Sequence, residues 1–106
     1  MFGSRTSNTT ARGSSFDRLT LDNVWTKAQV VPGYDPTQYR KDRCGAWIAR
    51  NSYGTTGQYG WEIDHDVPVA VGGSDNLSNL QPRHWENNRH KSDHYPAWTC
   101  ALPARS

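Results

Sequence analysis

The stretch WEIDHDVPVAVGGSDNLSNLQPRHWENNRHKSD, residues 61–93, combines an Asp-His pair, a Gly-Gly turn, two spaced asparagines and a basic tail. Its first half alternates apolar with polar or small residues, and a period of two indicates a half-buried strand or hairpin arm. Pro68 restricts that strand to an edge or a bulge, and Gly72-Gly73 permits a tight turn after it. Glu62 and Asp66, which lie between the apolar residues, are expected at the surface.

The second half of the stretch predicts a helix. Leu77 and Leu80 are expected as core anchors after the turn. Pro82 suits the first turn of a helix, because its missing N–H would be unpaired there in any case. The segment PRHWENNRHKSD, residues 82–93, then has the length of about three turns, with Trp85 as its buried anchor.

Outside this stretch the pattern predicts an N-terminal helix and short strands. Residues 1–15 are rich in Ser, Thr, Gly and Arg and are expected to form a disordered arm. A helix is expected over about residues 20–30, ended by Pro32-Gly33, and a short strand over residues 46–50. A chain of 106 residues holds at most one domain, which we place at residues 16–106. The predicted fold class is α+β with short antiparallel strands.

Composition limits the classes of function. Only 34% of the residues are hydrophobic, so the core is small, and the net charge of +2 permits a polyanionic partner without requiring one. No run of 18 apolar residues is present, which argues against a membrane span. The N-terminus has no apolar core typical of a secretory signal, so cytoplasmic residence is the default expectation. Nothing in the pattern indicates an oligomeric state.

The two cysteines, Cys44 and Cys100, leave three possibilities open. Neither lies in a C-x-x-C pair, so the usual zinc-ligand spacing is absent. Reduced thiols are favoured for a cytoplasmic chain. The alternatives are a disulfide between the two cysteines and a zinc site completed by histidines.

The polar residues of the stretch suit phosphodiester hydrolysis. An imidazole such as that of His65 accepts a proton from water near neutral pH, provided that its ring is held from the far side. Asn79, 14 residues on, offers such a neutral hydrogen-bonding group. Asp64 and Asn88 supply the hard oxygen atoms that Mg²⁺ prefers.

Asp64 and His65 cannot bind one ion together, because neighbouring residues of a strand point to opposite faces. In an in-line displacement, however, the attacking water and the leaving oxygen lie on opposite sides of phosphorus. A base on one side and a metal on the other is therefore the geometry that hydrolysis requires.

The motif IDHDVPVAVGGSDNLSNLQ, followed by HWENNRHKSD, resembles the HNH endonuclease family, in particular its HNN variant, with a ββα-metal fold. The intervals of 14 residues from His65 to Asn79, and of 9 from there to Asn88, agree with the family's. The resemblance covers about residues 61–93 and implies a ββα-metal core at about 60–93. It implies His65 as general base, Asn79 as the residue that orients it, and an exchangeable Mg²⁺ or Mn²⁺ on Asp64 and Asn88.

The predicted function is therefore a metal-dependent endonuclease that nicks nucleic acid, with DNA as the favoured substrate. Arg83, Arg89 and Lys91 are expected to hold phosphates, although a solvated helix face is the alternative. His84 and His90 are expected in surface or structural roles. Two other functions remain: a nucleic-acid-binding module that has lost turnover, and an interaction module braced by zinc on Cys44 and Cys100.

Overall fold

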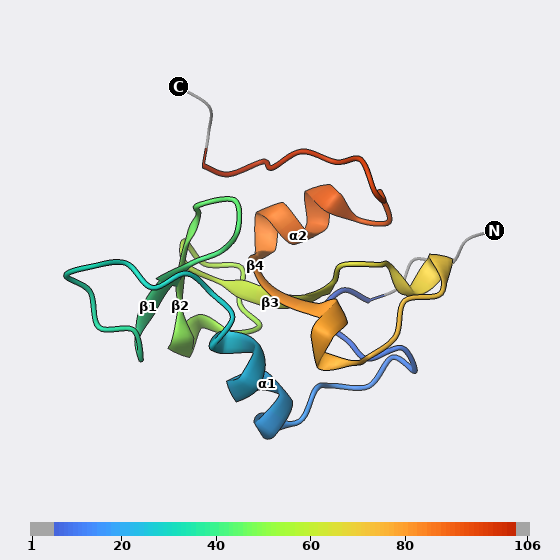
Figure 1. Cartoon of the computed structure of the whole chain (residues 1–106), viewed down its shortest axis with the longest axis horizontal. Coiled ribbons are helices and arrows are strands. Elements are labelled where there is room, and N and C mark those ends of the chain that lie inside the picture. The colour runs from blue at the N-terminus through green and yellow to red at the C-terminus, as the bar shows by residue number, and fades with distance from the viewer. Residues whose placement is uncertain (1–5, 104–106) are drawn as a thin grey trace.

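Two α-helices and two antiparallel two-stranded sheets form the regular structure of residues 6–103, the part of the chain that the computed structural model describes (Figure 1). Helix α1 (Arg18–Trp25) is followed by the hairpin of β1 (Tyr39–Lys41) and β2 (Trp47–Ala49). Then come β3 (Trp61–His65), β4 (Leu80–His84) and α2 (Trp85–Lys91). Three short 3₁₀ helices, at Arg50–Ser52, Val69–Val71 and Leu77–Asn79, lie in the connections. The expected α+β class is confirmed.

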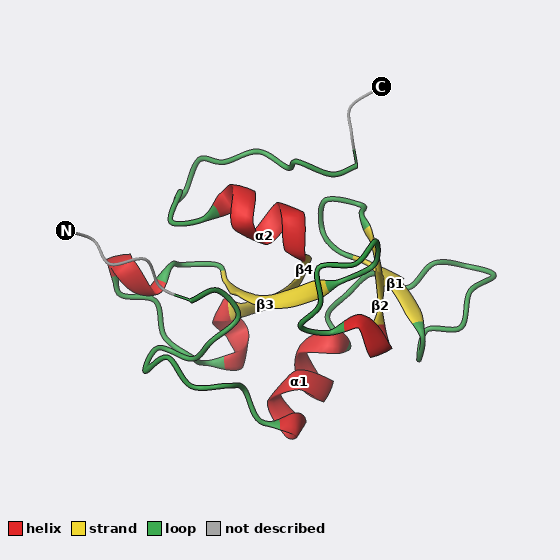
Figure 2. Cartoon of the chain, turned by 180° about the vertical axis from the view of Figure 1, so that it is seen from behind, coloured by secondary structure: helices red, strands yellow, loops and turns green. Residues whose placement is uncertain are grey.

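The β3–β4 sheet separates an apolar layer from a polar one. It lies between the two helices, with α1 against one side and α2 against the other, as both Figure 1 and Figure 2 show. In the register, Ile63 faces Pro82 and Asp64 faces Gln81. Because side chains alternate between the faces of a strand, the odd-numbered residues of β3 and the even-numbered residues of β4 share the α1 side. The other face meets α2.

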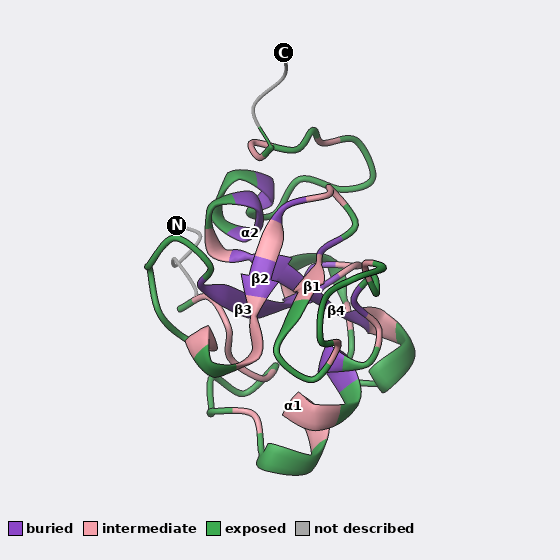
Figure 3. Cartoon of the chain, turned by 90° about the vertical axis from the view of Figure 1, so that its left-hand side faces the viewer, coloured by how far each residue is buried: buried purple, intermediate pink, exposed green. Residues whose placement is uncertain are grey.

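The apolar layer is the hydrophobic core. Trp61, which has no exposed surface, packs against Trp25 of α1 at 5.2 Å between ring centroids and against Tyr53 at 4.8 Å. Both strands of this sheet are buried along their whole length, as the purple ribbon in Figure 3 shows. The core consists of Val24, Trp25, Ala28, Ile48, Trp61, Ile63 and Leu80. The expected role of Leu80 is confirmed, whereas Leu77 is 43% exposed and is not a core anchor.

Pro82 lies in β4, and its expected place in the first turn of a helix is wrong. Its partner in the register, Ile63, donates its N–H to Asn8, outside the strand pair. The hydrogen bonds across the hairpin are those of other pairs, such as Asp66 N to Asn79 O and Trp85 N to Gly60 O. Since hydrogen-bonded and non-bonded pairs alternate in antiparallel strands, Pro82 occupies a non-bonded position and its missing N–H costs no ladder bond.

Helix α2 is consequently shorter than predicted. It begins at Trp85, and the ring of His84 caps it by accepting a hydrogen bond from Glu86 N. His84 is buried, so its role is structural, as expected. Trp85 is only partly buried and therefore does not anchor the helix as predicted.

The other predicted elements are partly confirmed. The strand expected at 46–50 is β2, and α1 overlaps the expected helix but begins at the N-cap Asp17, which accepts a hydrogen bond from Thr20 N. Helix α1 ends at Trp25, earlier than expected, and Gln29 then pairs with Lys41 in an antiparallel bridge. The strand expected to continue through residues 69–71 is wrong. These residues form a 3₁₀ helix that ends at Gly72, whose φ of 97° suits glycine.

Cys44 and Cys100 form a disulfide, so the expectation of reduced thiols is wrong and the alternative pairing is correct. The zinc-braced alternative fails with it, because both cysteine ligands are consumed. Disulfides are typical of oxidising compartments, so the bond does not support the prediction of cytoplasmic residence. Among residues 6–103 there is no helix with the length and hydropathy of a membrane span.

The N-terminal segment, residues 6–15, lies against the domain. Asn8 accepts hydrogen bonds from the Tyr53 hydroxyl and from Ile63 N, on the edge of β3 that faces away from β4. The disordered arm expected at residues 1–15 therefore does not describe residues 6–15. Residues 1–5 lie outside the described part of the chain, and the prediction for them stays a prediction.

Candidate active site

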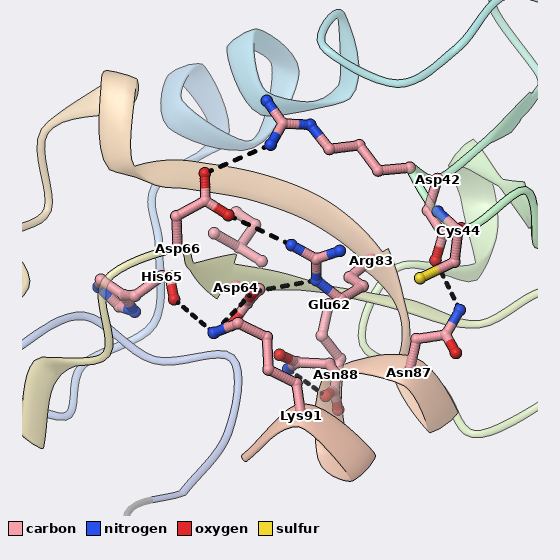
Figure 4. A network of polar contacts seen from close by, with 12 residues as sticks. Asp42, Cys44, Glu62, Asp64, His65, Asp66, Arg83, Asn87, Asn88 and Lys91 are labelled. Carbon is pink, nitrogen blue, oxygen red and sulfur yellow. Dashed lines mark hydrogen bonds and ion pairs between the residues drawn. The ribbon is translucent and has the colours of Figure 1, made fainter. Parts of the chain in front are cut away.

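Three of the predicted catalytic residues line one cavity of about 280 Å³. Asp64 and His65 come from the end of β3 and Asn88 from α2, and the N-terminal segment at residues 6–9 forms a further wall. Figure 4 shows these side chains and the polar network around them. The fold thus brings a carboxylate, an imidazole and an amide to one concave surface.

Asp64 is a buried carboxylate between two cations. It lies on the α2 face of β3, where Arg83 Nε approaches Oδ2 at 2.9 Å and Lys91 Nζ lies 3.3 Å from both oxygens (Figure 4). Burial raises the pKa of Asp64, and the positive charges of Arg83 and Lys91 oppose that shift. Oδ1, which has only the long Lys91 contact, is the less engaged oxygen.

Arg83 and Lys91 do not lie where they could hold the phosphates of a bound strand, so that expectation is wrong for both. Each is 1% exposed, because its charge is directed inward to Asp64. The indole of Trp98 covers them, with its centroid 4.6 Å from the Arg83 guanidinium and 5.9 Å from Lys91 Nζ. The pattern of basic residues on the helix therefore did not identify a solvent-facing patch.

His65 lies at the end of β3, with a side chain that is 8% exposed. Its Nε2 is 2.8 Å from Oδ1 of Asp75, and its backbone carbonyl accepts a hydrogen bond from Lys91 Nζ at 3.0 Å. Phe16 packs beside the ring at 6.0 Å between centroids. The ring is therefore held on one nitrogen by a carboxylate that the sequence motif did not single out.

Asn79 does not contact the His65 ring, and its expected role as the group that orients the base is wrong. Its side chain accepts from Val67 N at 2.8 Å and donates to Val67 O at 3.1 Å and to Ser74 O at 2.9 Å. Its backbone oxygen accepts from Asp66 N. Asn79 therefore holds the loop between β3 and β4 together through these bonds.

Glu62 links Asn88 to Arg89 and is 3% exposed, so its expected surface position is wrong. Asn88 Nδ2 donates to one Glu62 oxygen and Arg89 Nη2 to the other, each at 2.8 Å. The amide oxygen of Asn88 accepts no hydrogen bond from residues 6–103. Arg89 keeps a half-exposed side chain and is one of the residues that line the cavity.

Asp66, also expected at the surface, is partly buried. It accepts from Arg83 Nη2 at 3.3 Å, and Arg43 Nη1 lies 3.7 Å from its other oxygen. Asp66 therefore adds a second acid to the charge network around Arg83.

The donor atoms fit a hard divalent cation better than zinc. Residues 6–103 contain no cluster of three or more His, Cys, Asp or Glu side chains suited to a metal. Two oxygens lining one cavity, Oδ1 of Asp64 and the unengaged Oδ1 of Asn88, match the few protein ligands that Mg²⁺ takes alongside water and phosphate.

Asp42 forms a buried brace that the sequence analysis missed. It has no exposed surface, and its carboxylate accepts from Cys44 N, Ala46 N, His84 N and Asn87 Nδ2. Asn87 in turn accepts from Ala101 N and Leu102 N. The brace ties the β1–β2 turn to the start of α2 and to the C-terminal segment. Its sequence signal is weak, because nothing distinguishes this acid from a surface one.

Comparison with protein-family models, with curated proteins and with solved structures finds no match for the chain. A proposal for its function therefore depends on the chain's own residues and their geometry.

Proposed function

We propose that the chain is a metal-dependent endonuclease of the HNH type that hydrolyses phosphodiester bonds, with DNA as the favoured substrate. The observation that carries the proposal is the shared cavity of Asp64, His65 and Asn88. The consecutive order of β3, β4 and α2 supports a ββα-metal core, since each of these residues comes from the element that the motif predicts.

The opposed placement of base and metal ligands supports in-line hydrolysis. Asp64 lies on the α2 face of β3, and His65 follows it on the other face at the strand end. His65 takes a proton from water as the water oxygen bonds to phosphorus and the bond to the 3′ oxygen breaks. A Mg²⁺ ion bound by Asp64 and Asn88 would supply positive charge to the phosphate and the leaving oxygen.

Arg89 steadies the phosphate in this proposal. Glu62 orients the guanidinium at 2.8 Å, while about half of the side chain stays accessible to a ligand. A single base in one cavity cuts one strand per event, so a monomer nicks duplex DNA.

One observation favours a second candidate, a nucleic-acid-binding module without turnover. Arg83 and Lys91 already neutralise Asp64, so the carboxylate attracts a cation less strongly than an unpaired one does. The two candidates differ in whether a metal is held and whether the strand is cut.

A plasmid-nicking assay separates them. The wild type and His65→Ala are incubated with supercoiled plasmid in Mg²⁺, in Mn²⁺ and in EDTA, and DNA binding is measured in parallel by gel shift. We expect the wild type to nick only with metal, and His65→Ala to bind plasmid without nicking it.

The matched control is His90→Ala, since His90 is an exposed histidine on the same chain and lies outside the cavity lining. It should nick at the wild-type rate. Plasmid binding by the wild type without nicking in either metal would favour the module without turnover.

A further inference from the structure

The partner of the His65 ring is Asp75, ten residues on. Asp75 Oδ1 lies 2.8 Å from Nε2, within hydrogen-bond distance. A carboxylate only accepts, so this contact places a proton on Nε2, and in the neutral form of the ring Nδ1 then carries the lone pair. Asn79, the residue expected in this role, is engaged elsewhere.

The loop that carries Asp75 is held close to the end of β3. Gly73 N donates to Pro68 O at 2.9 Å, and a Cβ at Gly73 would meet the Val67 carbonyl oxygen at 1.6 Å. Only glycine permits this approach. Asn79 closes the same loop through its bonds to Val67 and Ser74, so the backbone before Asp75 is fixed on two sides.

The N-terminal segment orients the carboxylate itself. Ala11 N donates to Oδ1 of Asp75 at 2.9 Å and lies 3.2 Å from Oδ2. This backbone donor is 64 residues away in sequence. An Asp side chain that is 41% exposed is thereby kept in the orientation that meets the ring.

We propose that Asp75 is the positioning residue for His65. It accepts the Nε2–H bond, holds the tautomer in which Nδ1 faces the attacking water, and stabilises the imidazolium formed when Nδ1 takes the proton. The proton moves from water to Nδ1, the water oxygen bonds to phosphorus, and the 3′ oxygen leaves and is protonated by solvent. The role rests on the proposed function, because it assigns His65 as the base.

The test reads the tautomer directly. Long-range ¹H–¹⁵N spectra of the neutral His65 ring, assigned with His65→Gln, are recorded for the wild type, Asp75→Asn and Asp75→Ala, and nicking kinetics are measured beside them. We expect the Nε2–H form in the wild type and a mixture of tautomers in Asp75→Ala. The kcat should fall roughly 10- to 100-fold, as for other residues that orient a reacting group, with KM unchanged.

Asp75→Asn keeps the size of the side chain and an oxygen that accepts from Ala11 N. It therefore separates the effect of the carboxylate charge from the effect of a disrupted loop. Ser78→Ala, an exposed residue of the same loop, is the control and should change neither readout. An unchanged tautomer in Asp75→Ala, or a changed tautomer with unchanged kcat, would overturn the proposal. If the wild type fails to nick, a tautomer shift still assigns Asp75 as the ring's partner, and the nuclease proposal alone fails.

Discussion

Arg83 Nε lies 2.9 Å from Oδ2 of Asp64, and the two side chains, from β4 and β3, are 2% and 7% exposed. With Lys91 on the same carboxylate, the face of the sheet that meets α2 is a buried polar layer rather than a solvated one. The proposed metal ligand is therefore also a structural residue. Its substitution has to be judged on stability as well as on activity.

Asp64→Asn is expected to destabilise the fold by roughly 3–5 kcal/mol, because the buried Lys91 loses its counter-charge and the buried Arg83 keeps the more distant, partly exposed Asp66. The measurement is the free energy of unfolding from urea titration. Asp93→Asn is the control, since this exposed carboxylate lines the same cavity, and it should stay within about 0.5 kcal/mol of wild type. Combining Asp64→Asn with Arg83→Met should cost less than the sum of the two single changes. Additive costs would contradict the pairing.

Asn79→Ala should lower both stability and nicking, but nicking less than His65→Ala does. The change removes the bonds to Val67 and Ser74, and at about 1 kcal/mol net for each hydrogen bond the loss is roughly 2–3 kcal/mol. Nicking is measured under conditions in which the variant is folded, so that any remaining loss of rate reports the altered loop and not unfolded protein. Asn76→Ala, an exposed asparagine of this loop, should be close to wild type. A loss of nicking equal to that of His65→Ala would show that Asn79 does more than hold the loop.

Arg89→Ala is expected to weaken DNA binding at all sequences and to reduce the slope of log K against log salt by about 1, because one phosphate contact is lost. Binding is measured by fluorescence anisotropy over a series of salt concentrations. Arg18→Ala is matched in charge, and its side chain is 89% exposed on α1, away from the cavity. Equal slopes for the two variants would place the phosphate contact elsewhere.

The alternating pattern of residues 61–65 predicts a strand, because the pattern depends on local backbone geometry. The expectation that Asp64, His65 and Asn88 share one site comes from the resemblance to the HNH motif, and the three residues line one cavity. The same pattern could not reveal that Glu62 and Asp64 are buried. Polar residues at period two normally face water. Here they do not, because Arg83 and Lys91 pair with Asp64, and Arg89 pairs with Glu62.

The prediction for Pro82 was wrong for a related reason. A proline fits both the first turn of a helix and a non-bonded strand position, and only the register with Ile63 distinguishes the two. Three further contacts depend on the paths of loops, which no hydrophobic periodicity encodes. They are the contact of His65 with Asp75, the brace at Asp42 and the disulfide of Cys44 with Cys100.

Cys44→Ser and Cys100→Ser should each lower the free energy of unfolding by about 2–4 kcal/mol, because the disulfide links positions 56 residues apart and limits the unfolded chain. The double variant should match either single one, since both lose the same bond. Urea titrations with and without dithiothreitol check this, and the reductant should lower wild-type stability but leave the variants unchanged. Reduction should also expose Trp98, which lies over Arg83, as a red shift of the tryptophan fluorescence that is absent from Trp98→Phe. Two titratable thiols in the native protein would contradict the bond.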